Sequence, residues 1–373
     1  MRIDVFVHQM SGGGAERVAS NLASAWAEAG HQVRIVTMSP MEDVEYHPSP
    51  QVAIATLATP RWVERLGKLG RTADKLAGMR RAVVSSDADV MLAIGADMAV
   101  ELGLAGWGLP ARIVACEHNI PNRSIRRLWR PFRPAVYRRC AAVVALTERS
   151  AEELRRICPG AKVIAIPNPV RLPVPTVPPK VDPSSVVGPG RAMLLAVGRL
   201  NPVKGFDTLV RKFARLARER DEVDLCILGE GPLRAGLEAL IAERGLSGRV
   251  HLPGRVGNVS DWYGRASVLV MTSRAEGFPM VLLEALAHGL PAVVTDFRDG
   301  PREMVEPGVN GFIVPGKDDD LWVSTIRTVL EDDQLRARLS AAARRIQEDF
   351  GETPVLARWQ ALFEQLAAER DRA

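Results

Sequence analysis

The amino-acid sequence predicts an α/β protein built from two Rossmann-like domains, each with a parallel sheet. Short apolar runs alternate with helical patterns, and such alternation is typical of a doubly wound sheet. A proline-rich segment at 168–190 interrupts this alternation, which starts again after it. With 373 residues, the chain is also too long for one compact core.

The first half of the chain contains several apolar runs of strand length. A helix is predicted at 15–29, and Gly30 closes it. The predicted strands are 3–7, 33–37, 90–93, 112–116, 141–145 and 163–166.

The second half repeats the pattern after the proline-rich segment, which indicates an interdomain connector. We predict domains at 1–170 and 191–352, a linker at 171–190, and a helical end at 353–373. The predicted strands are 192–197, 224–228, 250–252, 268–271, 292–295 and 311–314.

Composition indicates a soluble globular protein, since 47% of the residues are hydrophobic and 25% are charged. No apolar run reaches the roughly 18 residues of a membrane span, and the N-terminus enters a strand directly, so we expect no signal peptide. The four cysteines lack metal-type spacing and predict reduced, mostly buried thiols in the cytoplasm.

Basic residues are concentrated in the first half of the chain. Residues 111–140 carry eight arginines against Glu117, with Trp129 and Phe132 as apolar anchors. Residues 60–86 carry seven basic residues against two acids, with the apolar anchors Trp62, Leu66 and Leu69. Such segments favour an anionic membrane surface or a polyanionic ligand. An ordinary solvated helix face is the alternative, and the shared location of the two stretches favours a peripheral membrane contact.

Residues 273–295 predict an anion site beside two carboxylates. A strand runs into a turn with Glu276, Gly277 and Pro279, and a helix then begins near Met280 with Glu284 in its first turns. The free N–H groups and positive dipole end of this helix suit a diphosphate. The two glutamates can accept hydrogen bonds from a sugar hydroxyl and a ribose hydroxyl, so the segment predicts a nucleotide-sugar site.

Glu276 and Glu284, separated by seven residues in a Glu-Gly-Phe-Pro context, resemble the Glu-x7-Glu signature of retaining GT-B glycosyltransferases of the GT4 type. The resemblance covers essentially the whole chain and is strongest at 197–295. It implies the GT-B fold, with two facing Rossmann-like domains, an interdomain cleft and a last helix that crosses back to the first domain. It also implies that Phe278, Pro279, Met280 and Val281 line the donor diphosphate.

A second motif, at 197–207, places Arg199 and Lys204 on a short loop before a helix. Two cations beside a helix N-terminus can neutralise a diphosphate in place of a metal, and the resemblance implies that they contact the donor. A surface salt bridge is the alternative. The acids at 318–320 are interpreted as a helix cap and solvated charge, not as metal ligands. No Asp-x-Asp element suited to a metal is evident elsewhere, so we expect a metal-independent protein, and we expect no cofactor.

Three further loops complete the predicted donor site by resemblance. Gly229 is assigned to packing around the nucleotide pocket, while Arg255 and Val256 belong to a loop that recognises the base, usually uracil. Gly13 and Gly14, in a glycine-rich loop that opens the first helix, are expected near the donor diphosphate or the acceptor.

His118 follows a predicted strand and is the catalytic candidate of the first half, together with Glu276, Arg199 and Lys204. The resemblance implies that this histidine points toward the reacting centre. A structural histidine bonded to loop carbonyls is the alternative. His8, His31, His47 and His251 lack a comparable context.

We therefore expect a retaining, metal-independent transfer from a nucleotide sugar to a lipid-linked or surface-polysaccharide hydroxyl. The donor is expected to be a UDP-sugar, such as a UDP-N-acetylhexosamine, and the acceptor a glycan or polyprenyl-linked molecule. Nucleic acid is not an expected partner, and the location is the inner face of the cytoplasmic membrane. An epimerase or phosphorylase on the same scaffold is the alternative, and a non-catalytic sugar-binding protein is a third hypothesis.

Overall fold

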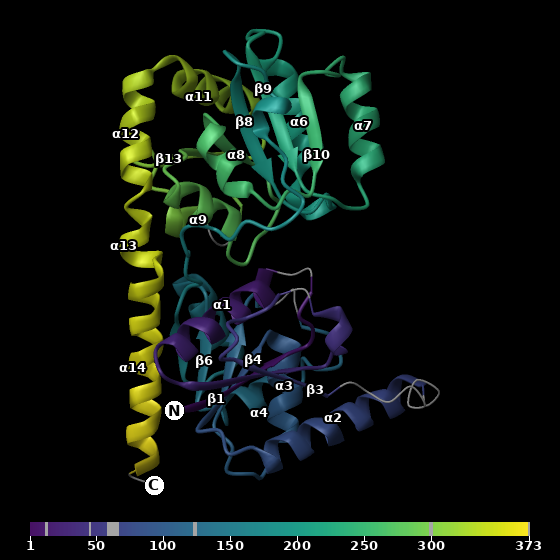
Figure 1. Ribbon diagram of the computed structural model, residues 1–373, viewed down its shortest axis with the longest axis vertical. Helices are drawn as coiled ribbons and strands as arrows, with labels where there is room; N and C mark the ends of the chain where they lie inside the picture. Colours follow the sequence, from purple (N-terminus) through teal and green to yellow (C-terminus); the bar gives the residue numbers. More distant parts are fainter. Residues whose placement is uncertain (12–13, 45, 58–66, 122–124, 298–300, 372–373) are drawn as a thin grey trace. The chain divides into compact units, whose positions relative to one another are not determined.

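The computed structural model describes residues 1–373 except 12–13, 45, 58–66, 122–124, 298–300 and 372–373 (Figure 1). The chain divides into two compact units. Unit 1 comprises Met1–Pro169 and Val355–Ala373, and unit 2 comprises Val170–Pro354. Each unit contains one fully parallel sheet, so the predicted α/β class with two Rossmann-like domains is confirmed.

Unit 1 contains a seven-stranded sheet in the order β3-β2-β1-β4-β5-β6-β7. Its strands are β1 Arg2–Val7, β2 Gln32–Thr37, β3 Ala53–Thr56, β4 Val90–Ile94, β5 Ile113–Glu117, β6 Ala142–Ala145 and β7 Val163–Ala165. The order reverses between β1 and β4, which pair directly in parallel. This point is the topological switch of a doubly wound sheet.

The helices of unit 1 connect successive strands and bury apolar side chains on the sheet. They are α1 Gly14–Glu28, the short 3-10 helix η1 Met41–Asp43, α2 Gly67–Ser85, α3 Ala96–Ala105, α4 Arg133–Tyr137 and α5 Glu148–Ile157. Strands β4, β5 and β6 are buried at every position, as expected for parallel strands covered on both faces. The edge strand β3 is only half-buried and was not predicted.

The C-terminal helix α14, Glu352–Asp371, packs against unit 1 (Figure 1). Trp359 and Phe363 form edge-to-face contacts with Trp26 of α1, at ring-centroid distances of 5.3 and 5.5 Å. Arg370 forms an ion pair with Asp89. These apolar and ionic contacts attach the C-terminal helix to unit 1, which otherwise consists of residues 1–169.

Unit 2 contains a six-stranded sheet in the order β10-β9-β8-β11-β12-β13. Its strands are β8 Ala192–Val197, β9 Val223–Leu228, β10 Val250–Gly254, β11 Val268–Met271, β12 Ala292–Thr295 and β13 Gly311–Val314. Its helices are η3 Pro183–Ser185, η4 Pro202–Lys204, α6 Phe206–Leu216, α7 Arg234–Glu243, α8 Val259–Arg265, α9 Met280–Ala287, α10 Pro301–Met304, α11 Asp319–Glu331, α12 Asp333–Ala343 and α13 Ile346–Phe350. The topological switch lies between β8 and β11.

The proline-rich segment belongs to unit 2, although the sequence analysis treated 171–190 as a connector. Val177 N–H donates to the Gly257 carbonyl, and Gly257 N–H donates to the Pro179 carbonyl. The Asn258 and Trp262 side chains both donate to the Val181 carbonyl. Prolines prevent this segment from joining a regular β-ladder, so its backbone groups need other hydrogen-bond partners. The bonds to residues 257–262 supply these partners and fix the segment to unit 2.

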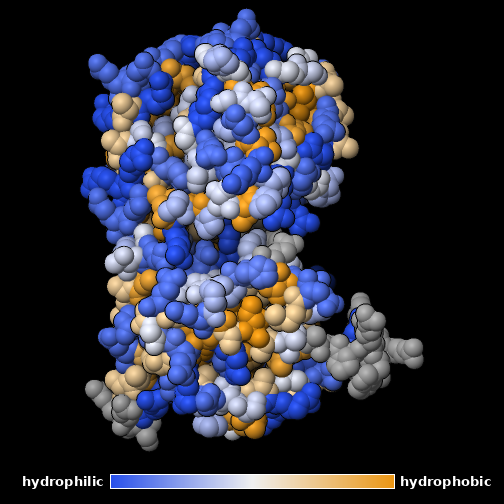
Figure 2. Space-filling model, in the orientation of Figure 1, coloured by the Kyte–Doolittle hydropathy of each residue, from blue (hydrophilic) through white to orange (hydrophobic). Residues whose placement is uncertain are grey.

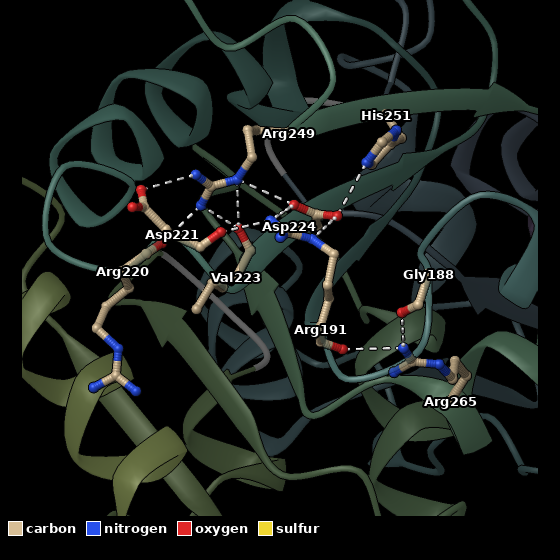
Figure 3. Close-up of polar contacts among 9 residues, drawn as sticks. All are labelled: Gly188, Arg191, Arg220, Asp221, Val223, Asp224, Arg249, His251 and Arg265. Atoms are coloured by element: carbon tan, nitrogen blue, oxygen red, sulfur yellow. Dashed lines mark hydrogen bonds and ion pairs between the residues drawn. The ribbon is translucent and has the colours of Figure 1, made fainter.

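A buried carboxylate joins the amino ends of three neighbouring strands in unit 2 (Figure 3). Asp224 of β9 accepts two hydrogen bonds from Arg191, at 2.9 and 2.7 Å, and one from Arg249 at 3.1 Å. His251 Nε2 lies 3.4 Å from the same carboxylate. Burial alone would raise the pKa of Asp224, but the bonds from Arg191 and His251 lower it. The network stabilises the edge of the sheet opposite the carboxyl ends of the strands.

Candidate functional site

The predicted cation Lys204 and carboxylate Glu276 meet at the topological switch of unit 2. Lys204 follows β8, Glu276 follows β11, and Lys204 Nζ donates to Glu276 Oε1 at 2.7 Å. Ser273 Oγ donates to the same oxygen, also at 2.7 Å. Within the described residues, Glu276 Oε2 has no partner and Lys204 Nζ has no second one. Both groups therefore retain capacity to bind a ligand where open α/β sheets bind theirs.

The two loops at this switch are fixed to each other by backbone contacts. Asn201 caps the Lys204 turn by accepting from the N–H groups of Val203 and Lys204. Gly205 has the left-handed conformation, with φ 65°, and a Cβ there would lie 2.2 Å from the Thr272 carbonyl oxygen. Only glycine permits this approach, which brings the Lys204 loop against the segment that leads to Glu276.

The predicted glycine Gly229 serves close packing between strand ends. Its φ is 134°, and an added Cβ would lie 2.0 Å from the Gly198 carbonyl oxygen. The Lys204 side chain passes directly over Gly198. A Cβ added at Gly198 would lie only 2.9 Å from Lys204 Cε. These glycines thus leave the space in which the lysine reaches Glu276.

Helix α9 begins at Met280, as predicted, and Pro279 precedes it. The Phe278 side chain is buried, with its ring 6.0 Å from that of Phe350. The ring therefore points into unit 2, and only the backbone of Phe278 is left for a ligand. The N-cap residue Pro279 makes no side-chain capping bond, and within the described residues the N–H groups of Met280 and Val281 have no intrahelical acceptor.

Glu284 is buried, and Tyr263 donates a hydrogen bond to its Oε2 at 3.1 Å. Tyr263 comes from α8, and its ring lies 5.1 Å from that of His288. Tyr263 is not among the site residues predicted from the sequence. A tyrosine in an ordinary amphipathic helix gives no signal of such a contact.

The remaining predicted donor residues lie at neighbouring strand ends. The Arg199 side chain is exposed and makes no hydrogen bond or ion pair with the described residues. Arg255 is exposed and Val256 half-buried, and they follow β10. Gly277 is half-buried in the turn after Glu276. Glu230, in the loop after β9, accepts two hydrogen bonds from Arg234. Its carboxylate is therefore already paired with an arginine.

In unit 1, His118 is buried directly after β5. Burial lowers its pKa to about 4, so the imidazole is neutral at ordinary pH. Its Nδ1 is buried without a hydrogen-bond partner among the described residues. The alternative reading, a histidine bonded to loop carbonyls, does not account for this nitrogen.

A buried arginine supports the loop that carries His118. Arg133 donates to Glu117 Oε1 at 2.6 Å and to the Pro121 carbonyl at 2.7 Å, so one guanidinium contacts both ends of residues 117–121. Tyr137 donates to the same Glu117 oxygen at 2.5 Å. Burial raises the pKa of Glu117, although Arg133 and Tyr137 oppose that shift.

The predicted glycine loop of unit 1 is described only in part. Gly13 lies outside the described residues, and Gly14 is the first, exposed residue of α1. A Cβ added at Gly14 would meet no heavy atom of the described residues within 4 Å, so packing against that part of the chain does not require glycine there.

A second contact at a topological switch was missed by the sequence analysis. His8 directly follows β1, and its Nε2 lies 2.9 Å from Oε2 of Glu101 on α3. Glu101 is fully buried and also contacts Lys75 and Arg126. The position of His8 at the end of a predicted strand indicated a possible site residue. Its partner Glu101 is distant in sequence, so the contact itself could not be predicted.

The structure corrects the proposed membrane anchors. Trp129 is only 4% exposed and Arg133 2%, so neither side chain lies on the surface. Trp62 and Leu66, two anchors of the 60–86 stretch, lie outside the described residues. Leu128 and Phe132 are exposed, as is Trp107, whose ring lies 4.2 Å below the guanidinium of Arg139. Figure 2 shows apolar and hydrophilic areas interspersed on one face of unit 1.

No described helix is both long enough and apolar enough to cross a bilayer. The four cysteines are buried and unpaired, as predicted. Asp318 caps α11 by accepting from Leu321 N–H, which confirms the interpretation of that acid as a cap. Across the described part of the chain, no cluster of three His, Cys, Asp or Glu side chains is arranged to hold a metal ion.

Family models match the two halves of the chain. Residues 180–346 match the family described as glycosyl transferases group 1, and residues 12–172 match the one described as Glycosyltransferase Family 4.

Similar proteins span almost the full length of the chain. One is a Campylobacter jejuni α-1,4-N-acetyl-D-galactosaminyltransferase, described as acting on a GalNAc-GalNAc-diNAcBac-PP-undecaprenol substrate. It is 25% identical over 362 residues, or 96% of this chain and 97% of that protein. The amylovoran biosynthesis glycosyltransferase AmsD of Erwinia amylovora is 25% identical over 359 residues, or 93% and 95%.

Solved structures with the same architecture include Anabaena HepE in complex with UDP and glucose. Its TM-score is 0.77 at 20% identity, and each chain is covered completely, at 100%. Staphylococcus aureus TarM, solved with UDP and α-GlcNAc-glycerol among its ligands, has a TM-score of 0.77 at 13% identity and covers 97% of this chain and 99% of its own.

Proposed function

We propose that this chain, a glycosyltransferase of the group 1 kind with GT-B architecture, transfers a sugar from a UDP-sugar to an acceptor hydroxyl with retention of configuration. The observation that carries the proposal is the Lys204–Glu276 pair at the β8/β11 switch, beside an uncapped helix N-terminus. A cation, free amides and a carboxylate with a free oxygen match the diphosphate and the hydroxyl groups of such a donor.

The donor diphosphate binds to Lys204, Arg199 and the backbone amides at the start of α9. Lys204 and the helix amides are held in place before the ligand arrives, so they stabilise the charge that develops on the leaving phosphate without reorganisation. Two side-chain cations supply this charge in place of a metal ion. Gly277 and the backbone from Phe278 to Val281 line the diphosphate.

The two glutamates recognise the ends of the donor. Glu276, through its free oxygen, accepts hydrogen bonds from hydroxyls of the transferred sugar. Glu284, held by Tyr263, accepts from the ribose diol. The loop with Arg255 and Val256 contacts the base, and Gly229 keeps the adjoining strand end close-packed.

Transfer breaks the bond between the sugar C1 and the terminal phosphate oxygen and forms a bond between C1 and the acceptor oxygen on the same face. The acceptor proton passes to the departing phosphate, so atoms and charge balance without a further reagent. His118, neutral at ordinary pH, assists as a hydrogen-bonding group near the reacting centre. Gly13 and Gly14 lie near the donor or acceptor in this proposal.

The acceptor is a polyprenyl-linked or polysaccharide glycan, bound by unit 1, and the sugar is an N-acetylhexosamine. Support comes from the undecaprenol-linked glycan for which the C. jejuni relative is named and from the role of AmsD in amylovoran biosynthesis. Both relatives are described as transferases, which favours transfer over an epimerase or phosphorylase.

We further propose that the protein acts at the inner face of the cytoplasmic membrane. Exposed Leu128 and Phe132 belong to a segment of unit 1 that also carries the exposed arginines Arg127 and Arg138. Apolar side chains beside cations suit an interface with anionic lipids.

The proposal is tested by release of UDP. UDP-, GDP- and ADP-sugars are first ranked by the rise in melting temperature they cause, and octyl α-glycosides are then added as acceptors. We expect UDP-sugars to rank first, UDP release to require an acceptor, EDTA to have no effect, and the product linkage to be α. A chain that interconverts donors without an acceptor would be an epimerase, and one that binds donor without turnover would be a sugar-binding protein.

A further inference from the structure

The carboxyl edge of the unit 1 sheet carries a histidine–carboxylate pair at its topological switch. His8 follows β1, and Glu101 lies on the helix after β4, the strand that pairs with β1. His8 Nε2 and Glu101 Oε2 are 2.9 Å apart. In unit 2 the Lys204–Glu276 pair occupies the corresponding position, between β8 and β11. Ligands of open α/β sheets bind at this point.

Glu101 is an ionised acceptor in this pair. Its side chain is fully buried, which by itself raises the pKa, but hydrogen bonds from His8 and Lys75 lower it overall. Lys75 Nζ and Arg126 Nη2 each lie 2.5 Å from Glu101 Oε1. Arg126 also pairs with Asp97 at 2.7 Å, so these charges are matched within the cluster.

The ionised carboxylate determines the tautomer of the His8 ring. A carboxylate only accepts hydrogen bonds, so His8 Nε2 must carry the hydrogen. In the neutral ring, Nδ1 then has a free lone pair. Nδ1 has no partner among the described residues, and the His8 side chain is 37% exposed. The ring therefore offers one fixed acceptor to a ligand that can donate.

We propose that His8 is an acceptor-binding residue, whose Nδ1 takes a hydrogen bond from a hydroxyl of the acceptor sugar, and that Glu101 is the positioning residue that fixes this geometry. The inference rests on the proposed glycosyl transfer, in which unit 1 binds the acceptor. Lys75 and Arg126 keep Glu101 ionised and in place. A hydroxyl is the matching ligand group because it donates to a lone pair, whereas a phosphate oxygen at ordinary pH does not.

The tautomer is measured without any substrate. Nitrogen-15 NMR of histidine-labelled protein at pH 8 is expected to show the His8 ring as the neutral Nε2–H form, assigned by its loss in His8→Gln. A dominant Nδ1–H form would overturn the proposal, since Nδ1 would then be a donor.

The binding role is measured with one variant that separates the two functions of the His8 ring and with one control variant. His8→Gln keeps an N–H that can reach Glu101 but lacks the acceptor at the Nδ1 position, and the fold is preserved if its melting temperature matches that of the wild type. The exposed residue His47, replaced by Gln, is the matched control. The probe is the octyl α-glycoside that gives the wild type its highest rate of UDP release.

We expect His8→Gln to raise KM for this glycoside by about fivefold or more, as for loss of one hydrogen bond. KM for the donor is expected to stay at the wild-type value, because His8 is assigned to the acceptor. Unchanged KM and kcat for the glycoside in His8→Gln would overturn the proposal. The proposed function fails differently: the wild type would then release no UDP with any acceptor, while the NMR result would still report on the His8 ring.

Discussion

Lys204 Nζ and Glu276 Oε1 lie 2.7 Å apart, although the two residues are 72 positions apart in the chain. The contact brings together the ends of β8 and β11, and Ser273 shares the same carboxylate oxygen. A preformed ion pair orients both side chains before a donor binds. The energetic value of this arrangement lies in the groups left free, namely Glu276 Oε2 and the remaining N–H donors of Lys204.

Replacing Glu276 by Gln is expected to lower kcat by about 100-fold or more, the usual effect of losing one preorganised electrostatic contact to a transition state. The amide is a weaker acceptor for sugar hydroxyls and no longer pairs with Lys204. The measurement is the initial rate of UDP release at saturating donor. Glu306→Gln, an exposed position in the same unit, is the control. Equal rates for both variants would remove Glu276 from the site.

Tyr263→Phe is expected to raise KM for the donor by about fivefold, because Glu284 loses one of its donors and its position against the ribose. A double-mutant cycle with 2′,3′-dideoxy-UDP tests that contact. The variant and the wild type should bind this analogue equally, since the diol is missing. A penalty of the same size with UDP and with the analogue would show that Glu284 does not bind the ribose.

The lowered pKa of His118 makes unfolding sensitive to pH. Its folded pKa is about 4, against roughly 6.5 in an unfolded chain, so the unfolded state binds more protons between these values. Stability from this group is present above about pH 6.5 and is lost as the pH falls toward 4. Compared with His118→Asn, the wild type should lose about 2–3 kcal/mol of unfolding free energy between pH 7 and pH 4.5. Urea titrations at both pH values measure this difference, and parallel losses in the two proteins would refute the neutral buried form.

Double replacement of Leu128 and Phe132 by Ser is expected to reduce binding to vesicles of phosphatidylglycerol and phosphatidylcholine. Both side chains are exposed, at 54% and 44%, beside exposed arginines. Leu321→Ser, at an exposed apolar position in unit 2, is the control. Flotation at low and high salt measures the effect. Wild-type flotation that depends on neither anionic lipid nor salt would exclude this surface as a membrane contact.

The strands were predictable because buried parallel strands are apolar along their whole length. The predicted ranges 192–197, 268–271, 292–295 and 311–314 coincide with β8, β11, β12 and β13. The edge strand β3 was missed because it is only half-buried, so its sequence lacks that continuous apolar signal. The 3-10 turn at Pro202–Lys204 and the start of α9 follow from local residues and could be anticipated.

Contacts that depend on strand order were not predictable. His8 and Glu101 meet only because β1 and β4 are neighbours, and Tyr263 reaches Glu284 only through the packing of α8 near α9. Trp129 and Arg133 were expected on the surface because their segment is rich in arginine. The guanidinium of Arg133 is nevertheless buried, because the Glu117 carboxylate compensates its charge.

The diphosphate site in unit 2 is tested most directly by calorimetric titration of UDP into the wild type and Lys204→Ala. Lys317→Ala, at an exposed lysine of the same unit, is the matched control. We expect UDP binding to weaken by about tenfold or more in Lys204→Ala, as for a lost charge-assisted hydrogen bond, and to stay unchanged in Lys317→Ala. Equal UDP affinity in Lys204→Ala and the wild type would contradict the assignment of this loop to the donor diphosphate.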